Sequence, residues 1–333
     1  MSPPAAILSR PRVISLLPSA TEVLCIIGGE PLLVGRSHEC DSPVSVRALP
    51  VLTAQRTPDN ADSASIDRAV RESLASGQSL YNVDDALLKR LRPDLVLTQN
   101  LCSVCSIDLA HVQRVAHTMR ADDGSPVRIV SLDPHTVEDV IDTLLIVGEA
   151  TGLAASATAA AVRLREHLFS TMEYVNPFES RGNVLFLEWT DPMFCAGHWT
   201  VQLIERAGGL HPLNPTAIKP GHGAAAGPQH GEQVAGPSRT ITPEEALASD
   251  PQWLVVCPCG FDLERSTAAA KAFLSQPWTR SLPAVRAGRI AAVDGNLHFN
   301  RPGPRLVEAF DWLVGWLNDR PSLIPPDFAW KAL

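Results

Sequence analysis

Thiols recur at short spacings in this sequence, and thiolates are among the strongest metal ligands in proteins. Cys102 and Cys105 form a C-x-x-C pair, and Cys257 and Cys259 form a tighter C-P-C pair. A structural zinc site takes four ligands, often from two such pairs, whereas a redox-active C-x-x-C opens a helix after a strand. Three interpretations therefore remain open: a zinc or iron site, a redox pair, or small side chains that line a pocket.

A second group of possible ligands is the run His38, Glu39, Cys40 and Asp41. Successive side chains of an extended segment point in alternate directions, so at most two of these four can face one point. A metal site can draw on both groups. The metal ligands of this hypothesis are Cys102, Cys105, Cys259 and His38.

Two further segments carry side chains suited to binding. Glu188 ends an apolar run and brings a carboxylate to the end of a predicted strand, while His198 and Trp199 open a predicted helix. A neutral histidine at a helix start suits metal ligation or hydrogen bonding. The sequence contains no G-x-S-x-G, G-x-x-x-x-G-K-[ST], H-E-x-x-H or G-x-G-x-x-G motif, so no enzyme class is indicated.

An internal duplication shows which elements position these residues. Three pairs of segments match in the same order, and each combines apolar strand-like runs with helical patterns or turns. Continuous apolar strands separated by helices predict parallel sheets covered on both faces. The matched pairs are 12–29 with 183–209, 84–99 with 243–258, and 127–134 with 288–295.

The duplication predicts an α/β protein with two Rossmann-like lobes that contain parallel sheets. The N-terminal lobe covers residues 11–135 and the C-terminal lobe residues 182–320. Residues 136–176 carry apolar side chains at helical spacing and predict a linking helix, either continuous or made of two abutting helices. The Gly- and Pro-rich stretch 219–238 predicts a flexible insertion in the second lobe.

The loops that follow the strands are the expected ligand site, because open parallel sheets bind ligands beside the carboxyl ends of their strands. In a two-lobed protein, these loops are expected to face a cleft. They concentrate Cys, Trp and His, and apolar walls with a few polar anchors are typical of a small-molecule pocket. The candidate ligand-binding residues are His38, Glu39, Cys40, Gln99, Cys102, Cys105, Glu188, Trp189, His198, Trp199, Cys259, Phe261, Phe299 and Arg301.

The composition is that of an ordinary globular protein. Of 333 residues, 45% are hydrophobic and 19% charged, and the formal net charge is −8. This charge disfavours nucleic acid and anionic membranes as main partners. The apolar run near the N-terminus is short and interrupted by proline, so neither a signal peptide nor membrane insertion is expected. These features predict a cytoplasmic protein with reduced cysteines.

Several stretches resemble the class III solute-binding proteins, which bind vitamin B12, haem and iron-siderophores for ABC importers. The resemblance covers roughly residues 11–320 and includes PRVISLLPSATEVLCIIG, LLKRLRPDLVLT, VRIVSLDP and FNRPGPRLVEAFDWLVGWL. The loop motifs SHECD, LCSVC, AGHW, CPCGF and RPGPR resemble a cobalamin-binding subgroup that lacks a secretion signal.

The resemblance implies a non-catalytic protein that holds a cobalamin-like corrinoid or another metal chelate between its lobes. By position, Phe299 and Arg301 would lie on the second-lobe wall, whereas Glu39 stands where B12 binders tend to have an aromatic residue. Glu244 matches a carboxylate that docks on the importer permease, but Ala86 occupies the corresponding first-lobe place. The alternatives are a Zn, Fe or Co binding protein or metallochaperone that uses cleft Cys and His, and a metalloenzyme.

Overall fold

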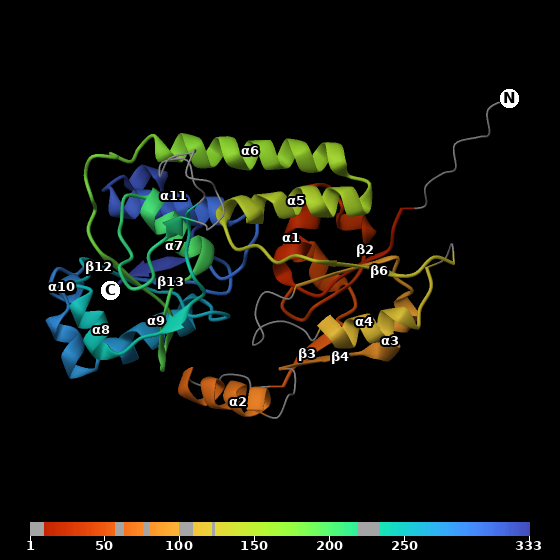
Figure 1. Ribbon diagram of the computed structural model, residues 1–333, viewed down its shortest axis with the longest axis horizontal. Helices are drawn as coiled ribbons and strands as arrows, with labels where there is room; N and C mark the ends of the chain where they lie inside the picture. Colours follow the sequence, from red (N-terminus) through yellow and green to blue (C-terminus); the bar gives the residue numbers. More distant parts are fainter. Residues whose placement is uncertain (1–9, 57–62, 76–79, 100–108, 122–123, 219–232) are drawn as a thin grey trace. The chain divides into compact units, whose positions relative to one another are not determined.

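The computed structural model describes residues 10–56, 63–75, 80–99, 109–121, 124–218 and 233–333 (Figure 1). The chain divides into two compact units. Unit 1 consists of Met1–Pro58, Val70–Asp133 and Asp142–Ala161. Unit 2 consists of Asp59–Ala69, Pro134–Ile141 and Val162–Leu333.

The central sheet of unit 1 is parallel throughout its described strands. Its strand order is β2-β1-β5-β6, and a short antiparallel pair, β3 and β4, lies beside it as a separate ribbon. The strands are β1 (Val13–Ser15), β2 (Leu33–Arg36), β3 (Thr53–Gln55), β4 (Tyr81–Val83), β5 (Leu95–Thr98) and β6 (Arg128–Ser131). Apolar side chains of β1 and β5 fill the core on both faces, as expected for strands covered on both sides.

Helices cover both faces of this sheet (Figure 1). Pro18 supplies the first residue of the helix after β1, a position where its missing N–H costs nothing. Asp84 caps the helix before β5, since its carboxylate accepts a 2.8 Å hydrogen bond from the backbone N–H of Leu87. The helices of unit 1 are α1 (Pro18–Ile26), α3 (Asp85–Leu91) and α4 (Leu109–His117), with 3-10 turns at Glu30–Leu32 and Val44–Ala48. The helix α2 (Ser63–Ala75) is divided between the two units after Ala69.

The sheet of unit 2 is mixed. Its order is β11-β8-β7-β12-β13-β14, and the central β7, β12 and β13 are parallel whereas β8, β11 and β14 run antiparallel to their neighbours. The strands are β7 (Val184–Thr190), β8 (Met193–Cys195), β11 (Arg239–Thr240), β12 (Trp253–Val256), β13 (Ile290–Val293) and β14 (Trp330–Ala332). A separate antiparallel pair is formed by β9 (Ala217–Ile218) and β10 (Gln233–Val234).

The helices of unit 2 pack on both faces of its sheet. One face forms an apolar core with α8, α9 and α10. On the other face, the ring of Phe299 packs edge-on against Phe186 of β7 and Trp312 of α11. The helices are α7 (His198–Arg206), α8 (Pro243–Ala248), α9 (Leu263–Leu274), α10 (Pro283–Arg286) and α11 (Leu306–Leu317), with 3-10 turns at Pro277–Ser281 and Pro321–Leu323.

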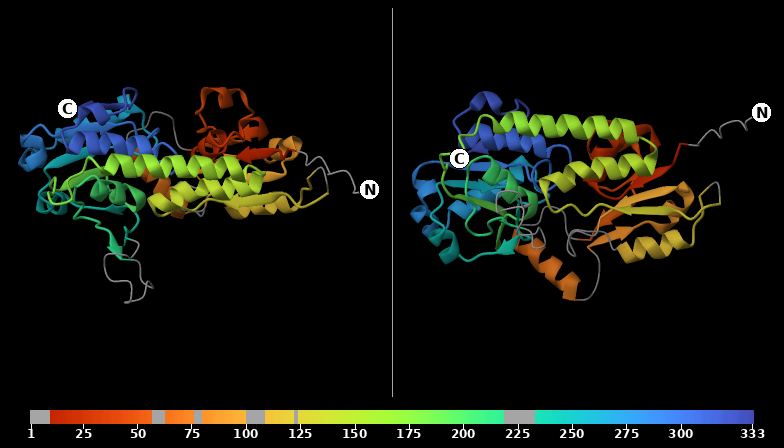
Figure 2. Two further views of the ribbon diagram at one scale, coloured as in Figure 1. Left: turned by 90° about the horizontal axis from the view of Figure 1, so that it is seen from above. Right: turned by 45° about the horizontal axis from the view of Figure 1, so that its top comes forward.

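The predicted linking helix is two helices, α5 (Val137–Thr151) and α6 (Ala154–Met172). Gly152, with φ of 76°, ends α5, and α6 then runs alongside it in both views (Figure 2). Gly148 permits this close approach, because a Cβ at that position would lie 2.3 Å from the Cβ of Ala157. Both helices contribute residues to both units.

The duplication read from the sequence is present in the structure. The segments 84–99 and 243–258 each form a short helix followed by a parallel strand, α3–β5 and α8–β12. The segments 127–134 and 288–295 form the equivalent strands β6 and β13. The predicted α/β architecture with repeated units is therefore confirmed.

Candidate functional site

A small pocket lies at the carboxyl ends of β1, β2 and β5 in unit 1. Its volume is about 30 Å³. The chain leaves β1 for β2 on one side of the sheet and reaches β5 on the other side, so the pocket lies at a topological switch point, where ligands of open α/β sheets bind. The lining residues are Leu16, Leu17, Pro18, Ser37, Glu39, Tyr81, Thr98 and Gln99.

Polar contacts from the β3–β4 ribbon hold the loop after β2 in place. The hydroxyl of Tyr81 donates a 3.3 Å hydrogen bond to Glu39 Oε1. The hydroxyl of Thr53 lies 2.6 Å from Nδ1 of His38 and accepts a 2.9 Å hydrogen bond from its backbone N–H. The rings of His38 and Tyr81 are 5.6 Å apart. Glu39 and Gln99 therefore line the pocket, and His38 lies beside it.

Cys40 does not line this pocket. It is fully buried, and the hydroxyl of Thr21 in α1 donates a 3.0 Å hydrogen bond to its sulfur. Its side chain fills the space between the loop and α1, and its contact with a ligand stays a prediction.

Cys102 and Cys105 lie outside the described residues, so the C-x-x-C hypotheses stay predictions. Within the described part of the chain, no three His, Cys, Asp or Glu side chains gather as metal ligands. The proposed contributions of His38 and Cys259 to a metal site likewise stay predictions.

Glu188 brings a carboxylate to the strand ends of unit 2. It is half-buried at the end of β7 and accepts hydrogen bonds from the backbone N–H of Gly197, at 3.3 Å, and from the hydroxyl of Ser238. Burial raises the pKa of Glu188 to about 7, although the two hydrogen bonds oppose this shift. Only glycine fits at position 197, since a Cβ there would lie 2.2 Å from the backbone nitrogen of Ser238.

The C-P-C pair divides its thiols between the surface and the core. Cys259 is exposed, and its backbone N–H donates a 3.1 Å hydrogen bond to the carbonyl of Glu188. Cys257 is fully buried, and burial raises the pKa of its thiol well above the ordinary value. Of this pair, only Cys259 is accessible to a metal ion or ligand from solvent.

Aromatic residues predicted for the site pack closely in unit 2. Trp189 is half-buried and meets Phe261 edge-on at 5.2 Å, and its Nε1 donates to the carbonyl of Asp191 at 3.1 Å. The guanidinium of Arg265 lies 3.9 Å from the centre of the Phe261 ring. Phe261 is therefore held from two sides, while Trp189 keeps part of its surface open.

Trp199 and Phe299 are core residues. Trp199 is buried, and its Nε1 donates a 2.6 Å hydrogen bond to the carbonyl of Phe299. Phe299 is fully buried among aromatic rings. The apolar surface of both residues is used in packing, and their contact with a ligand stays a prediction. Arg301 is also buried, with its guanidinium donating to Asn296 Oδ1 at 2.7 Å.

His198 opens α7 in the left-handed conformation, with φ of 48°. Its ring is 5.2 Å from that of His135, which is exposed. Burial and the proximity of His135 lower the pKa of His198. His198, a predicted binding residue, therefore contacts a histidine that lies 63 positions earlier in the chain. No sequence pattern connects the two residues.

Sequence reasoning misses Tyr81 as well. It precedes the predicted helix of 84–99 instead of following a strand of the main sheet, so the strand-end rule does not select it. The pairing of Tyr81 with Gln55 in the β3–β4 ribbon places its phenol beside Glu39. Tyr81 is one of only two tyrosines in the chain, which is the only signal that the sequence offers.

Solved structures share this fold, although no family model and no curated protein matches the sequence. The periplasmic vitamin B12-binding protein BtuF of Vibrio cholerae superposes with a TM-score of 0.62 at 17% identity, over 93% of this chain and 98% of that chain. The fold is that of the class III periplasmic binding proteins.

Two other solved structures agree. A periplasmic haem-binding protein from Pseudomonas aeruginosa has a TM-score of 0.63 at 19% identity and covers 93% of both chains. A possible iron-binding, periplasmic solute-binding protein from Staphylococcus epidermidis has a TM-score of 0.63 at 18% identity, over 92% of this chain and 99% of that chain. The class III fold expected from the sequence motifs is thereby confirmed.

The two positions considered for permease docking occupy equivalent places in this fold. Glu244 is the second residue of α8 and Ala86 the second residue of α3, and both are exposed. Asp85, next to Ala86, lies 2.9 Å from the ring of His111. Among the described helices, none is long and apolar enough to cross a bilayer.

Proposed function

We propose that this protein is a non-catalytic binding protein for a metal chelate of the tetrapyrrole type, with corrinoids preferred over haem. The observation that carries the proposal is the pocket at the switch point of the unit 1 sheet. Class III binding proteins of the same fold include proteins described as binding vitamin B12 and haem. Their ligands supply the chemical class that the proposal adopts.

The size of the pocket limits what it can hold. At about 30 Å³ the pocket is far smaller than a macrocycle, so it accommodates one peripheral group and not the ring itself. Leu16, Leu17 and Pro18 contribute apolar groups to the lining, and Glu39 and Gln99 contribute polar groups. We infer that the ring covers the pocket mouth and inserts one side group.

The polar lining favours amide side groups over carboxylates. Corrinoids carry carboxamide side groups, which donate hydrogen bonds, whereas haem carries anionic propionates. None of the eight lining residues is basic, and Glu39 is a carboxylate. Glu39 accepts hydrogen bonds from an amide but repels another carboxylate. This is the basis for placing corrinoids first.

The strand-end loops of unit 2 carry further groups suited to ligand contact. They are Glu188, the open part of Trp189, and exposed Cys259. Importer docking is not part of the proposal, because Glu244 matches a docking position and Ala86 offers no charge at the other. The cytoplasmic location stays a prediction, which fractionation of a tagged chain would test.

The proposal is tested by titrating the purified protein with aquocobalamin, dicyanocobinamide and haemin, using calorimetry and visible absorption. We expect a 1:1 complex with a corrinoid, and Glu39→Lys should shift the preference toward haemin. Glu72→Lys is the matched control, because Glu72 is exposed on α2. Failure of all three chelates to bind would overturn the proposal. Glu39→Lys and Glu72→Lys changing the preference between corrinoids and haemin equally would also overturn it.

A further inference from the structure

Two histidines from distant parts of the chain lie together in unit 2. The ring centres of His135 and His198 are 5.2 Å apart, and the ring planes meet at 52°. His135 is exposed just before α5, and His198 is half-buried at the start of α7. Nδ1 of His198 is buried and has no hydrogen-bond partner within the described residues. A buried polar atom without a partner often marks a bound water or ion.

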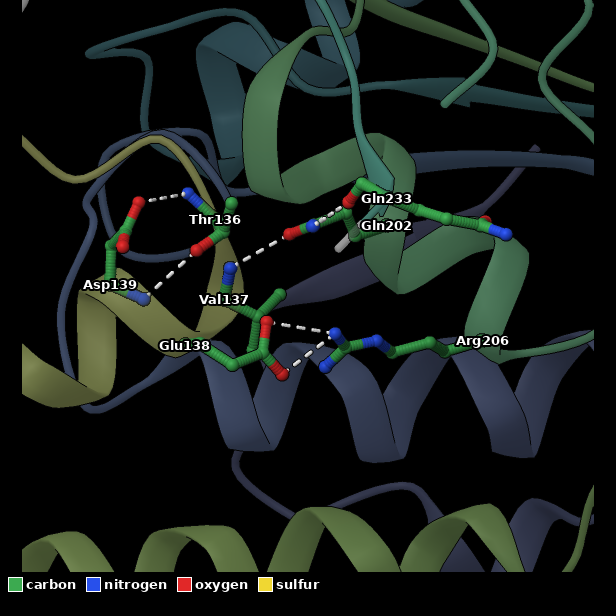
Figure 3. Close-up of polar contacts among 7 residues, drawn as sticks. All are labelled: Thr136, Val137, Glu138, Asp139, Gln202, Arg206 and Gln233. Atoms are coloured by element: carbon green, nitrogen blue, oxygen red, sulfur yellow. Dashed lines mark hydrogen bonds and ion pairs between the residues drawn. The ribbon is translucent and has the colours of Figure 1, made fainter. Parts of the chain in front are cut away.

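Hydrogen bonds attach the residues that follow His135 to α7 (Figure 3). The backbone N–H of Thr136 donates to Asp139 Oδ2 at 3.0 Å, and Asp139 N–H donates to the Thr136 hydroxyl. The backbone N–H of His135 donates to the same carboxylate oxygen at 3.0 Å. Val137 N–H donates a 2.8 Å hydrogen bond to Gln202 Oε1 of α7. The start of α5 is thus bonded directly to the helix that His198 opens.

An ion pair reinforces this arrangement one turn further along α7. Arg206 donates to both carboxylate oxygens of Glu138, at 2.7 and 2.9 Å. Both contacts come from one guanidinium nitrogen, Nη2, and they hold the first turn of α5 to α7. The backbone beneath the two histidines is therefore preorganised.

His198 is held in a conformation that its residue type rarely adopts. Its φ of 48° is left-handed, and such a residue costs on the order of 1 kcal/mol. The 2.9 Å hydrogen bond from its backbone N–H to the carbonyl of Gly236 helps to hold it there. The nearly parallel stacking of its ring on Trp199, at 5.7 Å, orients the imidazole.

We propose that His135 and His198 bind one divalent transition-metal ion, such as Zn²⁺ or Ni²⁺, with one imidazole nitrogen each. Two imidazoles at metal–nitrogen distances of about 2.1 Å and a tetrahedral angle have ring centres roughly 5 Å apart. The observed separation of 5.2 Å matches this value. Imidazole is a preferred ligand for ions of this class.

The two imidazoles fill only part of the coordination sphere of a transition-metal ion. The described residues contribute no third ligand of the His, Cys, Asp or Glu type. The ion therefore keeps open positions for water or for a donor group of a bound molecule. This site shares no residue with the proposed thiol metal site or with the lining of the unit 1 pocket.

The test uses the full chain, titrated with Ni²⁺ alone and followed by calorimetry and by NMR of ¹⁵N-labelled histidine rings. We expect the ring signals of His135 and His198 to broaden together at the lowest Ni²⁺ additions. His135→Ala should remove one binding event or weaken it by about tenfold or more, as loss of a ligand exceeds loss of a supporting contact.

The second variant is His198→Asn, because asparagine adopts the left-handed conformation readily and so preserves the backbone. It should lose the same binding event. His117→Ala, which removes an exposed histidine of α4, is the control and should retain it. Circular dichroism and thermal unfolding verify that each variant is folded. Unchanged Ni²⁺ binding in folded His135→Ala and His198→Asn would overturn the proposal, as would first broadening at other histidines.

Discussion

The phenol of Tyr81 donates a 3.3 Å hydrogen bond to the carboxylate of Glu39, which lies 42 residues earlier in the chain. The two residues face the same pocket from different elements, the β3–β4 ribbon and the loop after β2. The contact orients the only carboxylate among the described lining residues, and in the proposed complex the phenol thereby positions the acceptor of a ligand amide.

We expect Tyr81→Phe to weaken corrinoid binding without unfolding the protein. A hydrogen bond to a charged group contributes about 1.5–3 kcal/mol when buried, and the partial exposure of this one reduces it to roughly 1 kcal/mol, or about fivefold in affinity. Calorimetric titration with dicyanocobinamide measures the change. Tyr174→Phe, which removes a half-exposed phenol of unit 2, is the control. Superimposable titrations for Tyr81→Phe and wild type would contradict a role for this contact.

Glu188 should make the protein less stable as the pH rises. Burial lifts its pKa from 4.5 to about 7 in the folded protein, whereas the unfolded chain titrates near the ordinary value. Between these two values the folded state holds a proton that the unfolded state has lost. The free energy of unfolding therefore decreases with rising pH across this window, by at most about 3 kcal/mol and less after allowance for partial exposure.

Glu188→Gln should remove this dependence. The amide oxygen can accept from the backbone N–H of Gly197 in place of Oε1, and the amide nitrogen, in place of Oε2, can donate to the Ser238 hydroxyl. The amide carries no charge to bury. Urea unfolding at about pH 5 and about pH 8 should show the variant gaining stability over wild type only at the higher pH. Glu264→Gln, on the exposed face of α9, serves as control. A variant that parallels wild type at both pH values contradicts the assigned cause.

Much of this fold is predictable from local pattern. Apolar strand runs, Gly-Gly helix ends and matched segments give the repeated β-α units without any structure. The antiparallel strands β8, β11 and β14 escape prediction, because runs of two or three residues carry no periodicity. The sequence allows either one continuous linking helix or two abutting helices, and the structure has two, divided at Gly152. In this arrangement Gly148 packs closely against Ala157.

The site is less predictable than the fold, for a physical reason. The strand-end rule selects Glu39, Gln99 and Glu188 correctly as residues near strand ends, but it cannot tell which side chains point into the core. Phe299 and Cys40 follow the same rule and are fully buried. Tertiary pairing brings His135 to His198, and no sequence spacing encodes that contact.

The attachment of α5 to α7 should depend far more on Gln202 than on Arg206. Gln202 Oε1 satisfies the buried N–H of Val137, so Gln202→Leu leaves that donor unpaired at similar side-chain volume and should cost about 1–3 kcal/mol. Arg206→Ala breaks only a partly exposed ion pair with Glu138 and should cost about 0–1 kcal/mol. Urea denaturation of the two variants compares them, and a larger loss for Arg206→Ala would reverse this ranking.

Among the described thiols, Cys259 should react first with an alkylating reagent. Cys40, Cys195 and Cys257 are buried, whereas Cys259 is exposed. The remaining described thiol, Cys25, is only partly accessible, and burial raises its pKa to about 12, so little of it is the reactive thiolate.

Pulsed labelling with iodoacetamide at neutral pH, followed by peptide mass spectrometry, measures the rate at each cysteine. Cys259 should be alkylated about tenfold or more faster than the other four, because it is exposed whereas they are buried or only partly accessible. Cys259→Ser should abolish the fast phase assigned to this peptide, while the slow labelling of Cys40 stays unchanged. Fast labelling of Cys257 in the folded protein would show instead that the C-P-C segment opens, and that both of its thiols are available to a metal ion.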